Sequence, residues 1–323
     1  MKYSSLGRTG MKVSKLCLGT MSFGDQTNEK EAFEIMDCAI ANGINFFDTA
    51  NEYGPRDPNN CFVRLKKGVS EEIIGDWFAQ GGNRREKTIL ATKVYYPMDN
   101  PDDGPNDADG LSAYKIRRSL EASLNRLKTD HLELYIMHHV DRKVTWEELW
   151  GTMESLTNEG KIYYVGSSNF AAHDLVKAQW FADKRNFLGL ASEQHRYAPL
   201  YRHAELEVLP TVKELGLGLM IWGPLCRGKL AGFIPDNIDP YRRKQLEDYY
   251  SLARDIGTDP ATMTLAWLLQ NPIVTTVITG AAEVKHLEYS LKALDLELSD
   301  DVLNRIDEIF PPFGEAPESY IWE

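Results

Sequence analysis

Cysteine is scarce in this sequence, and the few cysteines present do not form a motif. Cys17, Cys38, Cys61 and Cys226 are widely spaced, and no two of them make a CxxC pair. Neither a disulfide framework nor a zinc site is therefore predicted, and we expect no metal ligands. A reducing compartment, the cytosol, is the expected location.

Long apolar runs and an excess of positive charge are also missing. No run approaches the roughly 18 residues of a membrane span, and the first twenty residues lack a basic segment followed by an apolar core. Export and membrane insertion are therefore not expected. Asp and Glu number 48 against 36 Lys and Arg, so the formal net charge is -12. Nucleic acids and anionic membranes bind clustered Lys and Arg, so neither is predicted as a partner.

Short apolar runs alternate with amphipathic, helix-like stretches along the chain. This alternation predicts βα units and a parallel sheet. A β-hairpin comes first, with Lys2–Ser4 and Met11–Val13 on either side of a turn. Eight candidate strands follow at Leu16–Gly19, Phe46–Asp48, Ile89–Thr92, Leu134–Met137, Tyr163–Gly166, Ala191–Gln194, Leu219–Trp222 and Thr276–Thr279.

Eight strands alternating with helices predict an α/β fold, a closed (β/α)8 TIM barrel with an N-terminal β-hairpin and an extra C-terminal helix and tail. The length suits one such domain over residues 1–323. Helix starts are marked by Ser70 before two glutamates, by Ser112 and by Thr145. The alternative is an open doubly wound sheet, which would carry GxGxxG after its first strand, and the sequence has no such motif.

Four residues suggest one piece of chemistry: Asp48, Tyr53, Lys93 and His138. Three of them stand at the ends of predicted strands: Asp48 is the last residue of its strand, and Lys93 and His138 directly follow theirs. Tyr53 lies just beyond a strand, so all four should meet at the C-terminal rim of the barrel. An unperturbed tyrosine has a pKa of about 10. Lys93 should bring the pKa of Tyr53 toward neutrality and make it a proton donor, while Asp48 holds Lys93 in place. His138 should donate a hydrogen bond to the substrate oxygen.

Each of these residues also has a structural interpretation when taken singly. Asp48 could cap a strand end, Lys93 could be a surface charge and Tyr53 a loop aromatic. Their joint occurrence, in order, favours a site.

Five segments resemble, in order and spacing, the signature segments of the aldo-keto reductase superfamily: GINFFDTANEYG, ATKVYYPM, LYIMHHVD, YVGSSNF and MIWGPLCRGKL. The resemblance spans almost the whole chain. It implies a (β/α)8 barrel that binds NADPH across its C-terminal rim and transfers a hydride from the nicotinamide to an aldehyde or ketone. It further implies that Tyr53 is the general acid, that Lys93 and Asp48 support it, and that His138 orients the carbonyl.

The same resemblance implies a set of cofactor-binding residues. Ser168, Asn169 and Gln194 would bind the nicotinamide carboxamide, and the indole of Trp222 would stack on the ring. Pro224, Leu225, Arg227, Gly228 and Leu230 would cover the pyrophosphate. The other implied contacts are Gly19, Thr20, Met21, Asp48, Gly280, Ala282, His286, Tyr289 and Ser290.

The segment after the last predicted strand departs from the family pattern for NADPH. Members that prefer NADPH usually carry a serine, threonine or basic residue there, then Gln or Arg, then Glu-Asn. This chain has alanine, histidine, tyrosine and serine at the matching places, and Glu283 would repel a phosphate. Lys285 and the helix N-terminus could still attract one. NADP(H) is the expected cofactor, with NAD(H) as an alternative.

An insertion, Pro55–Gly68, separates Gly54 from the next helix. Because it follows Tyr53, it should rise over the mouth of the barrel. With the loop Tyr95–Gly110, whose aspartates should face the same rim, it would build a polar pocket for a polyhydroxylated or cationic carbonyl compound such as a keto-sugar. The alternatives are a solvated decoration or a subunit contact.

Three functions are compatible with these features. The first is an active carbonyl reductase acting on a small molecule. The second is a cofactor-sensing regulatory subunit, because potassium-channel β subunits share the family fold. The third is an alcohol or sugar dehydrogenase, which differs only in reaction direction. An oligomer is compatible with all three.

Overall fold

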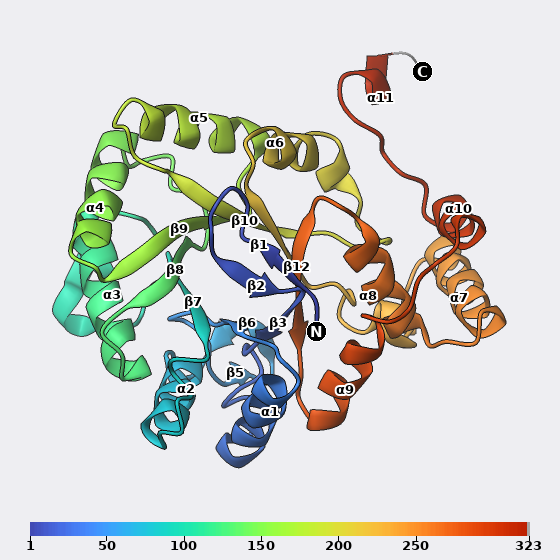
Figure 1. Cartoon of the computed structure of the whole chain (residues 1–323), viewed down its shortest axis with the longest axis horizontal. Helices are drawn as coiled ribbons and strands as arrows, with labels where there is room; N and C mark the ends of the chain where they lie inside the picture. The colour runs from blue at the N-terminus through green and yellow to red at the C-terminus, as the bar shows by residue number, and fades with distance from the viewer. Residues whose placement is uncertain (322–323) are drawn as a thin grey trace.

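Eight parallel strands close into a barrel, and helices surround it on the outside (Figure 1). The computed structural model describes residues 1–321, apart from the side chains of residues 61 and 62. Around the barrel the strand order is β10-β11-β12-β3-β4-β7-β8-β9. The strands are β3 (Leu16–Gly19), β4 (Phe46–Asp48), β7 (Ile89–Val94), β8 (Leu132–Met137), β9 (Ile162–Ser168), β10 (Leu190–Arg196), β11 (Gly218–Trp222) and β12 (Val274–Gly280). The predicted (β/α)8 fold is confirmed.

The helices shield the outer face of the barrel, and their apolar sides make the larger of its two cores. Phe47, for example, points outward and its ring lies 5.7 Å from that of Trp77. The helices are α1 (Glu29–Ala41), α2 (Val69–Ala79), α3 (Ala113–Leu127), α4 (Trp146–Asn158), α5 (Ala172–Asp183), α6 (Val208–Glu214), α7 (Pro240–Asp255), α8 (Pro260–Gln270), α9 (Val284–Lys292), α10 (Asp300–Ile309) and α11 (Glu318–Ile321). The last two form the predicted C-terminal addition, and α11 stands well away from the barrel (Figure 1).

Two of the three predicted helix starts are confirmed. The side chains of Ser112 and Thr145 accept hydrogen bonds from backbone N–H groups in the first turns of α3 and α4. The prediction for Ser70 is wrong, because α2 begins at Val69 and is preceded by Gly68, whose φ of 83° suits glycine. The Ser70 hydroxyl instead donates to the carbonyl oxygen of Thr20 at 3.0 Å, which ties α2 to the loop after β3.

The N-terminal hairpin of β1 (Tyr3–Ser5) and β2 (Lys12–Ser14) covers the end of the barrel at which the parallel strands begin. Its turn passes so close to β11 that a Cβ on Gly7 would lie 2.5 Å from the backbone nitrogen of Gly218. Leu6 and Val13 join the second core, which fills the barrel interior. Because the hairpin covers this end, we expect the site at the opposite rim, where the strands end.

The insertion after Tyr53 folds as a second hairpin, β5 (Arg56–Asp57) and β6 (Asn60–Arg64). A Cβ on Gly54 would lie 2.1 Å from the backbone oxygen of Lys66, so the hairpin packs directly on the segment that carries Tyr53. Arg56 anchors it through an ion pair with Asp25 at 2.6 Å. The insertion therefore packs against the rim of the barrel through specific contacts.

Three aspartates of the 95–110 loop bind partners in or beside the loop, whereas Asp109 acts on the predicted site: after burial and Glu52, its charge contributes to the raised pKa of Tyr96, whose ring lies beside that of His138. Asp107 accepts hydrogen bonds from the backbone of Met98 and Asn100 within its own loop. Asp103 pairs with Arg118 on α3, and Asp99 pairs with Lys67. Their carboxylates stabilise the loop because its backbone N–H groups and neighbouring cations need acceptors.

Two further observations bear on the composition-based expectations. Cys17, Cys38 and Cys226 are free thiols, and the side chain of Cys61 lies outside the described residues. Between residues 1 and 321, no helix combines the length and the apolar character needed to cross a membrane.

Candidate active site

The alternation of side chains along each strand brings the predicted catalytic residues together. Phe46, Ala91 and Ile136 belong to the core inside the barrel. Successive side chains of a strand point to opposite faces, so residues two positions further on, Asp48 and Lys93, point inward as well. His138 follows Ile136 in the same way, just past the end of β8. The backbone N–H of His138 donates to the carbonyl of Val94.

Lys93 is the centre of the site and is fully buried. Its ammonium donates to the Asp48 carboxylate at 2.6 Å, to the carbonyl oxygen of Thr49 at 2.8 Å and to the hydroxyl of Tyr53 at 3.1 Å. These bonds use all three of its protons. The bland interpretation of Lys93 as a surface charge is therefore wrong.

The pKa of Tyr53 does not move toward neutrality, contrary to the sequence-based expectation. Burial raises the pKa of Tyr53 to about 12, although the Lys93 ammonium acts to lower it. Desolvation outweighs the effect of Lys93 because the phenolate would form in a buried position, where its charge is poorly hydrated. Burial likewise opposes the charge on Lys93, but Asp48 and Tyr53 outweigh it and raise the pKa of this ammonium. At neutral pH the site thus holds a protonated tyrosine beside a charged lysine.

His138 faces the tyrosine across the mouth of the barrel. Its ring centre lies 6.0 Å from that of Tyr53 and 5.2 Å from that of Tyr96. Burial and then the charge of Lys93 depress the pKa of His138 well below its usual range, so the imidazole is neutral. Its Nδ1 is buried without a hydrogen-bond partner among the described residues. A proton on the other nitrogen, Nε2, leaves no buried N–H group unpaired.

This depressed pKa predicts a pH dependence of stability. The unfolded chain protonates His138 below about pH 6.5 while the folded chain does not, so the contribution is present above that pH and is lost as the pH falls. We expect wild type to lose up to about 1.4 kcal/mol per pH unit more than a His138→Gln variant between pH 6 and 5. Urea unfolding of both proteins at pH 7, 6 and 5 measures this difference; parallel pH curves would contradict it.

The residues predicted to bind the nicotinamide lie at the neighbouring strand ends and connect to the catalytic group. Gln194 donates to the second oxygen of Asp48 at 2.7 Å. Asn169 follows β9 with a left-handed φ of 59°; its amide nitrogen donates to Ser168 at 2.9 Å, and its oxygen accepts from the indole N–H of Trp222 at 3.0 Å. Two primary amides, a hydroxyl and an indole are thus gathered at one side of the rim.

The loop predicted to cover the pyrophosphate follows β11. Three consecutive residues, Cys226, Arg227 and Gly228, have left-handed φ values of 53°, 57° and 84°. Pro224 and Leu230 are buried, whereas the Arg227 side chain is exposed. Successive residues in such conformations can turn backbone N–H groups into one concave surface, and a cation beside it suits an anion.

The residues predicted at the adenosine end stand around the start of α9. Glu283 and Lys285 pair with each other at 2.7 Å. The Ser290 hydroxyl donates to the backbone oxygen of His286 within the helix, and Tyr289 is about half exposed. Next to this segment, Gly19 pairs with Gly280 across the neighbouring strands β3 and β12. The backbone nitrogen and the hydroxyl of Thr20 both donate to the carbonyl of Asp48. Met21 is 47% exposed.

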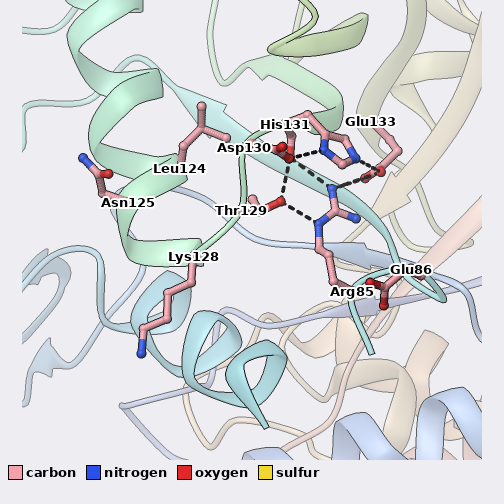
Figure 2. A pocket seen from close by; sticks show the side chains of 9 residues that line it. All are labelled: Arg85, Glu86, Leu124, Asn125, Lys128, Thr129, Asp130, His131 and Glu133. Carbon is pink, nitrogen blue, oxygen red and sulfur yellow. Dashed lines mark hydrogen bonds and ion pairs between the residues drawn. The ribbon is translucent and has the colours of Figure 1, made fainter. Parts of the chain in front are cut away.

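A cavity of about 720 Å³ lies at the other end of the barrel, away from the tetrad. Figure 2 shows its polar lining, in which Arg85 binds Thr129 and Glu133, and His131 lies between Asp130 and Glu133. Arg85 precedes β7, Thr129, Asp130 and His131 precede β8, and Glu133 lies near the start of β8 itself, so the network stands where the two strands begin. Because its charged groups already satisfy one another, we assign this network to holding the two strand starts together.

Sequence reasoning missed two charged residues beside Tyr53. Arg64, at the end of β6, forms an ion pair with Glu52, and its guanidinium carbon lies 5.8 Å from the centre of the Tyr53 ring. Glu52 could have been found from the sequence, because it directly precedes Tyr53. No local pattern could have found Arg64, because only the fold of the insertion brings it back to the tyrosine.

The fold and the tetrad together have the features of a barrel oxidoreductase. Comparison with known proteins agrees, and the chain belongs to the aldo/keto reductase family, whose model matches residues 15–310. A protein of Bacillus subtilis strain 168 described as "Uncharacterized oxidoreductase YrpG" is 51% identical, with both chains covered completely. The "Probable voltage-gated potassium channel subunit beta" of Arabidopsis thaliana is 33% identical, covering 99% of this chain and 100% of its own. "Protein tas" of Escherichia coli K12 is 32% identical over 96% of this chain and 97% of its own.

Proposed function

We propose that the protein reduces an aldehyde or ketone to an alcohol with a nicotinamide cofactor, NADPH or NADH. The observation that carries this proposal is the buried Lys93 ammonium, held between the Asp48 carboxylate at 2.6 Å and the Tyr53 hydroxyl at 3.1 Å. Such a group can donate a proton and stabilise the anion that remains, and it contains no activated nucleophile.

The proposed roles follow from these contacts. A reduced nicotinamide, held by residues such as Asn169 and Gln194, would supply a hydride for the carbonyl carbon. Tyr53 gives its proton to the carbonyl oxygen, which completes the alcohol and leaves a phenolate. Lys93 stabilises this phenolate at short range, and burial strengthens the attraction. Asp48 keeps Lys93 charged and fixed in place.

His138 orients the carbonyl in this proposal. A neutral imidazole with its proton on Nε2 can donate one hydrogen bond to the carbonyl oxygen without competing for the proton of Tyr53. After burial, Lys93 helps to keep His138 neutral. Lys93 therefore stabilises the charge on Tyr53, while the neutral His138 binds the substrate.

The residues present fit a nicotinamide cofactor. Asn169 and Gln194 have amide groups and Ser168 has a hydroxyl, which together offer the donors and acceptors that a carboxamide needs. The Trp222 indole is a flat apolar face for the ring. The left-handed turn after β11 and the exposed Arg227 suit the pyrophosphate.

The choice between the two cofactors should be weak. Glu283 pairs with Lys285 and so neutralises the cation nearest to the predicted site of the 2′-phosphate. We expect a preference for NADPH over NADH of less than about 100-fold in dissociation constant. Fluorescence titration of both reduced cofactors measures it. Glu283→Gln should increase the preference, since it frees Lys285; a strong wild-type preference that this variant leaves unchanged would place phosphate binding elsewhere.

The substrate is proposed to be a small polar carbonyl compound, such as a keto-sugar. A panel of aldehydes and ketones, with loss of cofactor absorbance as the readout, tests the activity. Oxidation of the corresponding alcohols would assign the reverse direction, that of an alcohol or sugar dehydrogenase. Tight cofactor binding without turnover of any carbonyl would favour a regulatory subunit; the Arabidopsis relative is described as a probable potassium channel subunit.

A further inference from the structure

Arg64 and Glu52 form an ion pair beside Tyr53, at the mouth of the barrel. Its closest atoms, Nε and Oε2, are 3.2 Å apart, and the two side chains are only 9% and 15% exposed. Arg64 also donates from its terminal nitrogen to the carbonyl oxygen of Gly54 at 3.0 Å. The guanidinium comes from the inserted hairpin and the carboxylate from the loop after β4, and the two are fixed against each other beside Tyr53–Gly54.

Both charges are close enough to act on the reacting groups. Burial is the largest cause of the raised pKa of Tyr53. The charges of Asp48 and then Glu52 raise it as well, while Lys93 acts to lower it. Arg64, after burial, Lys93 and His139, contributes to the depressed pKa of His138. The guanidinium also lies 5.8 Å from the centre of the Tyr53 ring. A carbonyl compound held by Tyr53 and His138 would thus have this pair beside it.

The hairpin has other contacts that hold it in place. Its first strand is fixed by Arg56, which pairs with Asp25 through both its side chain and its backbone N–H. Lys67 ties its far end to the carbonyl oxygen of Pro97 at 2.7 Å. A nearly buried ion pair loses much hydration and often stabilises a protein no more than apolar residues of the same volume. Its presence next to the proton donor therefore points to a use in binding.

The chemistry of the two groups indicates the kind of ligand. A guanidinium only donates hydrogen bonds and a carboxylate only accepts them, whereas a hydroxyl group does both. An anion would have to compete with Glu52 for Arg64, and a cation would have to compete with Arg64 for Glu52. A neutral hydroxyl group can bind both without separating them.

We propose that Arg64 and Glu52 recognise a hydroxyl group beside the carbonyl of the substrate, and that they make the enzyme selective for neutral hydroxylated aldehydes and ketones. This inference rests on the proposed carbonyl reduction and names its substrate class. It assigns to the insertion a role in specificity, with Arg64 as the residue that the insertion contributes.

Three probe substrates test the inference: glyceraldehyde, its deoxy analogue propanal, and the anionic aldehyde glyoxylate. We expect wild type to prefer glyceraldehyde by kcat/KM. In Arg64→Gln and in Glu52→Gln, the ratio of kcat/KM for glyceraldehyde to that for propanal should fall by about tenfold or more, mainly through KM for glyceraldehyde. Lys66→Gln is the matched control, because Lys66 is on the same hairpin but pairs with Glu72 in an exposed position, and its ratio should equal that of wild type.

Each other outcome overturns the proposal in a distinguishable way. Equal losses for glyceraldehyde and propanal would mean that the pair only supports the structure. A wild-type preference for glyoxylate that Arg64→Gln removes would mean that Arg64 binds an anion. Cofactor binding without reduction of any probe would defeat the proposed function itself, and this inference with it, whereas reduction with an unchanged ratio defeats this inference alone.

Discussion

Replacing Tyr53 with phenylalanine should remove nearly all carbonyl reduction while the protein stays folded and binds its cofactor. The substitution deletes only the hydroxyl, which is the proposed proton donor. General acid catalysis of this kind is worth about 10²- to 10⁴-fold, and we expect kcat to fall within that range. Lys93 keeps its bonds to Asp48 and Thr49, but one of its protons loses its acceptor, so the stability of the variant should fall by about 1–3 kcal/mol.

Steady-state kinetics, a cofactor titration and a urea unfolding curve check this prediction together. Tyr135→Phe is the matched control, because it also removes a buried tyrosine hydroxyl, one that donates to the carbonyl of Ile116 outside the site. The control should show a similar change in stability and near wild-type kcat. If Tyr53→Phe kept more than about a tenth of the wild-type kcat, another group would have to donate the proton.

Replacing Lys93 with methionine should damage both activity and stability. Without the ammonium, the Asp48 carboxylate stays buried with Gln194 as its side-chain donor. Removing one partner of a buried ion pair typically costs about 3–5 kcal/mol. The pKa of Tyr53 should also rise further, because Lys93 acts to lower it. We therefore expect a loss of activity on the order of that for Tyr53→Phe, together with a larger loss of stability.

A double variant separates these two effects. Lys93→Met combined with Asp48→Asn removes both charges, so it should be more stable than Lys93→Met alone although one more group has been altered. Its activity should not recover, because no cation remains beside Tyr53. Equal stability of wild type and Lys93→Met would contradict the buried pair, and recovery of activity in the double variant would contradict the role of the ammonium.

The order of strands and helices, and the meeting of the four proposed catalytic residues at one rim, were predictable from the sequence alone. The reason is that these features are local. A short apolar run marks each barrel strand. Side chains two residues apart in a strand point to the same face, so Asp48 and Lys93 point inward as Phe46 and Ala91 do. The rim on which they meet follows from the parallel arrangement, whatever the helices contribute.

Only the tertiary structure decided how these groups affect one another. Local residue types suggested a lowered pKa for Tyr53, but burial by the whole fold outweighs Lys93 and raises it. The bond of Gln194 to Asp48 joins positions 146 residues apart, and the ion pair of Arg64 with Glu52 depends on a hairpin that folds back over Gly54. Desolvation and pairing depend on every neighbour in space, and neighbours in space are set by chain closure and packing, which no local pattern contains.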